Sequence, residues 1–229
     1  MRVHWLQHAD HEGLGCMERW FAQRRWTIHG TRLQRGEALP QARDFDWLVV
    51  MGGPMNIYEH EAHPWLIGEK ALIRDACVMK KKVLGICLGA QLLAEVLGGR
   101  VTQNEEQEIG WFDVTLNAEA RKSAVFGDFP AKFPAFHWHG DTFAYPPGAT
   151  PLMSSEACAR QAFTWGEDRV VALQFHLEVE LEDARRWLDT GAPAPRRYVQ
   201  DAAEVLRDPG RFAENTRLMH LLLERMAAN

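Results

Sequence analysis

The segment Phe45–Met51 (FDWLVVM) constrains the fold more than any other part of the chain. It is almost wholly apolar and ends at Gly52-Gly53-Pro54, a pattern typical of a strand buried on both faces of a sheet. The next apolar strand, Val83–Ile86, runs directly into an apolar helix over Gly89–Leu97. Such alternation of strands and helices predicts right-handed crossovers and an α/β fold with a doubly wound, mainly parallel sheet.

Further strands and helices are expected on both sides of this unit. A first strand, Val3–Gln7, is followed by a Gly-containing turn and a short helix, and Pro64 opens a helix that runs to about Lys82. The second half of the chain is richer in strands, which are separated by turns such as Pro146-Pro147-Gly148. We expect these strands at Trp111–Leu116, Ala135–His139, Gln161–Trp165 and Arg169–Phe175.

The last part of the chain is predicted to be helical. Residues recur at helical spacing in three stripes: Leu181, Ala184 and Leu188; Tyr198, Ala202 and Leu206; and Phe212, Thr216, Met219, Leu223 and Met226. The break Gly191-Ala192-Pro193-Ala194-Pro195 separates the first stripe from the others. We therefore expect an α/β domain over residues 1–190 and a helical extension over residues 191–229, which is too short to fold alone and packs on the domain. The extension covers a flank of the sheet, or it forms a dimer or partner surface.

Charge and cysteine content exclude several classes of protein. The 229 residues carry 26 Lys and Arg against 31 Asp and Glu, a net charge of −5, which argues against a nucleic-acid-binding protein. Apolar runs are shorter than the ~18 residues of a membrane span, and the N-terminus is typical of a strand rather than a signal peptide. The cysteines at 16, 77, 87 and 158 lack paired spacing, as expected in a reducing compartment. We expect a cytoplasmic protein that binds neither nucleic acid nor membrane.

The pentapeptide Gly85-Ile86-Cys87-Leu88-Gly89 has the pattern of a nucleophile elbow, with cysteine as the nucleophile. Its glycines permit a tight, strained turn between the predicted strand and the predicted helix. The helix then points its positive dipole end at the sulfur, which favours the thiolate, and the N–H of Leu88 can face an oxyanion. A buried structural cysteine is the alternative, because free cysteine is among the most buried residue types. The pentapeptide alone leaves both interpretations open.

The segment Gln174–Glu178 (QFHLE) closes the last apolar strand. On an extended backbone, residues two apart point to one side, so His176 and Glu178 can face the same way. The carboxylate would then orient the imidazole and stabilise the imidazolium, which is the base that a cysteine nucleophile needs. A lone histidine at a strand end is more often structural, but its pairing with an elbow cysteine favours a catalytic role.

The glycines at Gly52-Gly53 follow a buried strand and form the third element of the candidate site. They allow close backbone approach to a ligand and a second oxyanion donor at Gly53, or they form an ordinary turn. Each of the three elements follows a predicted strand. Because the carboxyl ends of strands form the binding crevice of open α/β sheets, we expect the three elements to meet there.

The motifs GGP, GICLGAQ, HGD and QFHLE, in this order, resemble those of the class I glutamine amidotransferases. The nearest branch is the stand-alone one that is similar to the glutaminase domain of GMP synthase, and the resemblance covers roughly residues 40–180. The elbow and the His-x-Glu pair are specific together, whereas GGP and HGD are weak individually. The resemblance implies a flavodoxin-like sheet and a Cys-His-Glu triad of Cys87, His176 and Glu178.

The resemblance also implies the chemistry. The Cys87 thiolate would attack the side-chain amide of glutamine, with the N–H groups of Gly53 and Leu88 holding the oxyanion. His176 would protonate the departing ammonia, and water would hydrolyse the γ-glutamyl thioester to glutamate. The residues that match the family's substrate-binding positions are Gly52, Gln91, His139, Gly140 and Asp141. The substrate is thus expected to be glutamine or another γ-glutamyl compound.

Three functions remain open at this stage. Glutamine hydrolysis would supply ammonia to an acceptor on a synthetase partner, since the sequence lacks an ATP-binding loop of its own. The second is hydrolysis of γ-glutamyl peptides or amines by the same triad, and the third is a non-catalytic regulatory subunit.

Neither a metal nor a cofactor is expected. Gly13-Leu14-Gly15 lacks the third glycine of a dinucleotide-binding loop. His137 and His139, and the group of His8, His11 and Cys16, lack customary metal-ligand spacing, so we expect surface histidines there.

Overall fold

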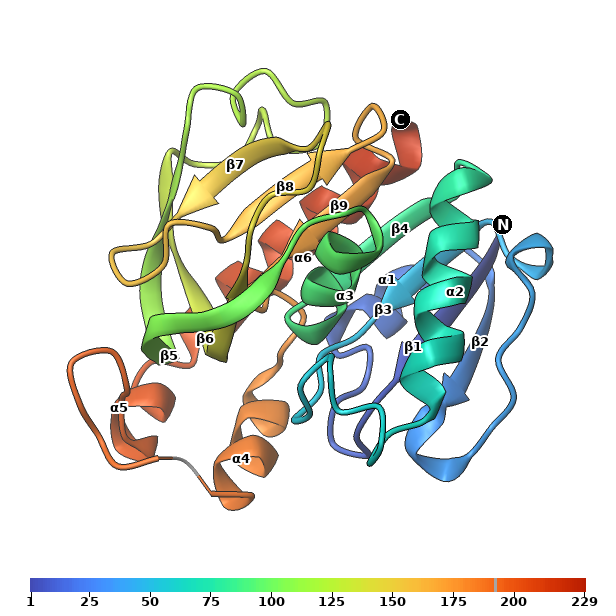
Figure 1. The fold of residues 1–229 in the computed structure, drawn as a ribbon. Helices are drawn as coiled ribbons and strands as arrows, with labels where there is room; N and C mark the ends of the chain where they lie inside the picture. The colour runs from blue at the N-terminus through green and yellow to red at the C-terminus, as the bar shows by residue number, and fades with distance from the viewer. Residues whose placement is uncertain (192) are drawn as a thin grey trace.

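A computed structural model describes residues 1–191 and 193–229. Its strands are β1 (Arg2–Gln7), β2 (Thr27–Arg32), β3 (Trp47–Val50), β4 (Lys82–Ile86), β5 (Val101–Leu116), β6 (Lys132–Phe143), β7 (Thr150–Ser154), β8 (Ala162–Trp165) and β9 (Val170–Leu173). They form one sheet in the order β2-β1-β3-β4-β9-β8-β7-β5-β6 (Figure 1). Strands β2, β1, β3, β4 and β9 are parallel, and β8, β7, β5 and β6 continue the sheet in antiparallel pairs.

The helices are α1 (Cys16–Gln23), α2 (Trp65–Val78), α3 (Leu88–Val96), α4 (Leu181–Asp189), α5 (Ala202–Leu206) and α6 (Gly210–Ala228). Helices α2 and α3 cover one face of the parallel half, and α1 and α6 cover the other (Figure 1). In β3, Trp47 and Val49 join the core beneath α1 and α6, whereas Leu48 and Val50 join the core beneath α2 and α3. Each residue of β3 is buried against one face or the other, which explains why its sequence is continuously apolar.

The α/β, flavodoxin-like fold with C-terminal helices is therefore confirmed, and the strand-rich second half provides its antiparallel strands. The sequence did not predict β2, β7 or the first part of β5. Strand β2 lies at the sheet edge and is mostly exposed, so it lacks an apolar pattern. The start of β5 reads VTQNEEQE, which is equally polar.

Two predicted helix assignments were wrong. The α2 helix ends at Val78 rather than near Lys82, because Lys80 adopts a positive φ of 55° that stops the helix. Tyr198 precedes α5, which begins after the N-cap Asp201, whose side chain accepts a hydrogen bond from the N–H of Glu204. Tyr198 lies instead in the segment before α5, and its carbonyl oxygen accepts a hydrogen bond from the Ile109 N–H at 2.9 Å.

Helix α6 shares the core beneath α1, whereas α4 and α5 contribute to a separate cluster. Leu218 and Leu222 of α6 are buried in the same cluster as Val3 of β1 and Trp20 of α1. The division at residue 191 stays a prediction, and Ala192 in the expected break lies outside the described residues. In the part of the chain that the structure describes, no helix combines the length and apolar character needed to cross a membrane.

Candidate active site

Cys87 occupies a strained turn between β4 and α3. Its φ and ψ are 52° and −106°, a conformation unusual for a residue with a side chain. Its backbone N–H donates to the Leu173 carbonyl of β9 at 2.7 Å. A Cβ on Gly89 would lie 2.1 Å from the Val50 carbonyl oxygen, and one on Gly85 would lie 2.6 Å from that of Gly89. Only glycine fits at either position, so the predicted elbow geometry is present.

His176 and Glu178 meet in a buried ion pair. The Nδ1–H of His176 donates to Oε1 of Glu178 at 2.7 Å, and both side chains are almost wholly buried. The Trp187 ring packs edge-on against the imidazole, with ring centroids 4.9 Å apart. The other ring nitrogen, Nε2, has no well-aligned hydrogen bond within the described residues. Burial lowers the pKa of His176, but the Glu178 charge and the nearby Cys87 raise it more, so the pKa lies well above its usual value and the imidazolium is favoured.

Cys87 opens into a small cleft of about 310 Å³. The predicted residues Gly53, Leu88, Gln91, His139, Gly140 and Asp141 all line it with Cys87. Five further residues that were not predicted to bind substrate also line it: Pro54, Met55, Asn56, Gln107 and Trp138. They come from the loop after β3, from β5 and from β6, so the fold brings them to the cleft.

Of the predicted substrate-binding residues, Gly52 does not line the cleft, and its carbonyl instead accepts a hydrogen bond from His8. His139 lies in strand β6, in the region predicted to be a strand, and its Nε2 contacts Oε2 of Glu108 at 3.0 Å. The side-chain amide of Gln91 donates one hydrogen bond to Oε1 of Gln174 at 3.3 Å.

Asp141 is the acidic group of the cleft. Its Oδ2 is buried and lacks a hydrogen-bond partner among the described residues. Burial raises the pKa of its carboxyl group. An unpartnered carboxylate oxygen at the cleft wall is suited to receive a ligand cation such as an α-ammonium group.

Comparison with known proteins identifies the family. The family described as glutamine amidotransferase class-I matches residues 21–190. The chain belongs to this family. It is 38% identical over 186 residues to the glutamine amidotransferase-like protein YfeJ of Salmonella typhimurium. The match covers 80% of this chain and 77% of that protein. A crystal structure of a glutamine amidotransferase from Methylobacillus flagellatus has 33% identity and a TM-score of 0.92, over 99% of this chain and 94% of the other.

The similarity to GMP synthase is also confirmed. The chain is 36% identical over 135 residues to GMP synthase of Thermomicrobium roseum. The match covers 58% of this chain and 23% of the synthase, so the matched region corresponds to about a quarter of that protein's length.

Several histidines of the chain are buried, which corrects the expectation of surface histidines. His8, His137 and His139 are each at most 4% exposed. His137, His139 and Glu108 each offer a ligand atom, and these atoms lie within 4.8 Å of one another, an arrangement that could hold a metal ion. The Glu108 carboxylate already accepts hydrogen bonds from Ser155 at 2.7 Å and Gln161 at 2.6 Å, besides its contact with His139. These hydrogen bonds make the cluster a polar network that reaches the cleft wall at His139.

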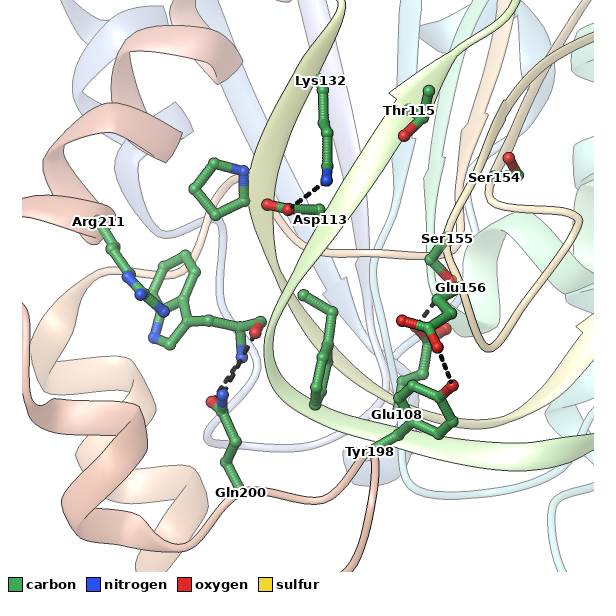
Figure 2. A pocket seen from close by; sticks show the side chains of 13 residues that line it. Glu108, Asp113, Thr115, Lys132, Ser154, Ser155, Glu156, Tyr198, Gln200 and Arg211 are labelled. Carbon is green, nitrogen blue, oxygen red and sulfur yellow. Dashed lines mark hydrogen bonds and ion pairs between the residues drawn. The ribbon is translucent and has the colours of Figure 1, made fainter.

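A larger hollow of about 630 Å³ lies beside Glu108 but does not reach Cys87. Figure 2 shows its charged and polar side chains, most of which are already paired. Lys132 contacts Asp113 at 2.8 Å, and the hydroxyl of Tyr198 donates to Glu156 at 2.9 Å. This hollow is where the segment before α5 meets strand β5, and it offers none of the chemistry of the Cys87 cleft.

Glu12 is a buried carboxyl group that the sequence analysis missed. A Cβ on Gly52 would lie 2.4 Å from Oε2 of Glu12 and 3.3 Å from Cε1 of His176, so Glu12 faces the imidazole across Gly52. Burial raises the pKa of Glu12 to about 7, against the opposing influence of His176 and His8. The sequence does contain an indication of this residue, because Glu12 follows the carboxyl end of the first strand, where ligands bind in open α/β sheets.

Replacement of Glu12 by glutamine should stabilise the protein more at high pH than at low pH. The pKa of Glu12 is about 7 in the folded state against 4.5 for the free group, so its ionisation on going from about pH 5 to pH 9 weakens the folded state. Because glutamine does not ionise, the free energy of unfolding of E12Q relative to wild type should rise by about 2 kcal/mol over that range. Urea unfolding at both pH values measures this change.

The exposed Glu61 provides the control. The difference between E61Q and wild type should stay constant over the same range. A difference between E12Q and wild type that is equally constant would contradict the placement of Glu12.

Proposed function

We propose that this amidotransferase hydrolyses the side-chain amide of glutamine through a γ-glutamyl thioester on Cys87. The observation that carries the proposal is the strained Cys87 elbow, which opens into the cleft beside an imidazole held by Glu178. An ionised cysteine paired with an imidazolium is the form that attacks a carbonyl group most readily.

The first half of the reaction forms the thioester. The Cys87 sulfur attacks the amide carbon, and the N–H groups of Gly53 and Leu88 stabilise the negative charge on the carbonyl oxygen. The His176 imidazolium gives its proton to the nitrogen as the C–N bond breaks, so ammonia leaves and a neutral imidazole remains.

The second half restores the enzyme. Neutral His176 removes a proton from water, whose oxygen attacks the thioester carbon. Collapse of the second tetrahedral intermediate breaks the C–S bond and releases glutamate. The pair of thiolate and imidazolium is thereby regenerated, with Glu178 orienting His176 in both halves.

The cleft fits the amino-acid end of a γ-glutamyl group. Asp141 would accept the α-ammonium group, and the amide side chains of Asn56 and Gln107 would lie near the α-carboxylate. The walls bear amides, glycines and one acid, and no lysine or arginine lines the cleft in the described residues. Recognition would therefore rest on hydrogen bonds rather than on a cationic clamp.

We further propose that the ammonia serves an acceptor on a separate synthetase partner in the cytoplasm. The support is the match to GMP synthase, which is named as glutamine-hydrolysing and of which this chain spans about a quarter. Free, unpaired cysteines are also typical of the cytoplasm.

The test compares two substrates with purified protein. Glutamate release is measured from glutamine and, separately, from a γ-glutamyl dipeptide, with Cys87→Ala as the control. We expect faster turnover of glutamine. Faster turnover of the dipeptide would replace this proposal with γ-glutamyl hydrolysis, and failure of a glutamine analogue to label Cys87 would favour a non-catalytic subunit.

A further inference from the structure

A second buried His–Glu pair, His8 and Glu69, contacts the loop after β3. His8 follows β1, and Glu69 lies on α2, so the pair joins two elements that are distant in sequence. Their Nε2 and Oε1 atoms are 2.7 Å apart, and both side chains are fully buried. Neither residue lines the cleft, so the pair does not contact the substrate.

His8 contacts the glycine loop through its second nitrogen. Its Nδ1 lies 2.8 Å from the carbonyl oxygen of Gly52. Since both the carbonyl and the carboxylate are acceptors, both ring nitrogens donate and the ring is an imidazolium. The effect of burial, which lowers the pKa of His8, is outweighed by Glu69 and the Gly52 carbonyl, so the pKa is raised overall.

The carbonyl of Gly52 and the N–H of Gly53 belong to one peptide group. In a trans peptide these two groups point in opposite directions, so a carbonyl held toward His8 turns the N–H away from it. Gly53 lines the cleft together with Cys87 and Leu88. Two consecutive glycines give this peptide unusual freedom to rotate, and the hydrogen bond from His8 removes that freedom.

The same hydrogen bond strengthens the N–H as a donor. A donor at the carbonyl end of a peptide polarises the whole group, and such chains of hydrogen bonds reinforce one another in a low-dielectric interior. Here the donor is a charged imidazolium, which polarises more strongly than a neutral group. Close packing adds rigidity: a Cβ on Gly53 would lie 2.8 Å from the Cβ of His8.

We propose that His8 and Glu69 are a positioning pair that orients and polarises the Gly52–Gly53 peptide, so that the Gly53 N–H binds the oxyanion formed at Cys87. The inference rests on the proposed function, in which Cys87 attacks a carbonyl group. His176 moves protons during the reaction, whereas His8 keeps its proton and acts through the peptide.

Two reactions of Cys87 separate positioning from a merely structural role. Acylation by p-nitrophenyl acetate passes through a tetrahedral oxyanion, whereas alkylation by iodoacetamide displaces iodide at a saturated carbon and forms none. In the double variant H8L/E69L, which avoids leaving a buried charge unpaired, acylation should slow by about tenfold. Alkylation should stay within about twofold, because it makes no use of the oxyanion donor.

A rescue variant and a control variant show whether the effect on acylation depends on the hydrogen bond to Gly52. The variant H8N/E69Q keeps a donor near the position of Nδ1 and should recover most of the acylation rate. His4 is the matched control, because it lies on β1 and its ring bonds to Thr31 at 2.9 Å rather than to the loop after β3. H4L should leave both rates unchanged.

If H8L/E69L and wild type were acylated at the same rate, the proposal would be overturned. A decrease in the alkylation rate of H8L/E69L as large as the decrease in its acylation rate would also overturn it. Failure of H8N/E69Q to recover acylation would also overturn it. The probe is an ester rather than glutamine, so the outcome is independent of the natural substrate. A wild type that is acylated by the ester but does not hydrolyse glutamine would overturn the proposed function and leave this test valid.

Discussion

Replacement of Cys87 by alanine is expected to lower kcat for glutamine hydrolysis by about a millionfold, the loss typical of removing a covalent nucleophile. The remaining side chains of the cleft cannot form a thioester, and water would have to attack the amide directly. The residual rate would come from the oxyanion donors and substrate binding alone. Glutamate release over long incubations measures kcat.

The fold should survive this change, because alanine replaces a side chain of similar size and tolerates the φ of 52° no worse than cysteine does. Cys77→Ala is the matched control, since Cys77 is also buried but lies on α2. C77A should retain the kcat of wild type. Turnover by C87A at a rate close to that of wild type would contradict the assignment of the nucleophile.

Replacement of Glu178 by glutamine should lower kcat by about 10³- to 10⁴-fold, less than the loss at Cys87. The hydrogen bond between the Glu178 carboxylate and Nδ1 of His176 is 2.7 Å long. Because both side chains are buried, water screens the interaction between the carboxylate and the imidazolium very little. Loss of the charge lowers the pKa of His176, which destabilises the pair of thiolate and imidazolium. Steady-state kinetics over a range of pH measure kcat and KM.

The pH dependence of kcat distinguishes the loss of the Glu178 charge from unfolding of the variant. The fraction of His176 in the imidazolium form should decrease at lower pH in E178Q than in wild type, and the alkaline limb should move with it. Glu182→Gln provides the control, because Glu182 is exposed and pairs with Arg185 on α4 rather than with a residue of the active site. E178Q with wild-type kcat, or E182Q with an equal loss, would exclude the proposed role of Glu178.

The parts of the fold that local pattern determines were predicted from the sequence. Strands β3 and β4 are apolar on both faces, and α3 is apolar almost all round, so their periodicity indicated burial directly. The elbow glycines around Cys87 and the two-residue spacing of His176 and Glu178 are also local features. The contact between His176 and Glu178 could therefore be expected before the fold was known.

The parts that depend on distant contacts were not predicted. Glu69 lies 61 residues from His8, and Glu108 lies 31 residues from His139. Nothing in the spacing of these residues indicates a partner. The crossover helix α2 brings Glu69 to His8, and the antiparallel pairing of β5 with β6 places Glu108 opposite His139. The expectation of surface histidines failed for this reason, since only the packed fold reveals which histidines have a buried carboxylate beside them.

The most direct test of the account is the detection of the covalent intermediate. The protein is quenched with acid during turnover of glutamine, digested and analysed by mass spectrometry. The account predicts one γ-glutamyl group on the peptide that contains Cys87, absent from C87A and from unreacted enzyme. Steady production of glutamate by an enzyme in which Cys87 remains unmodified at every quench time would contradict it.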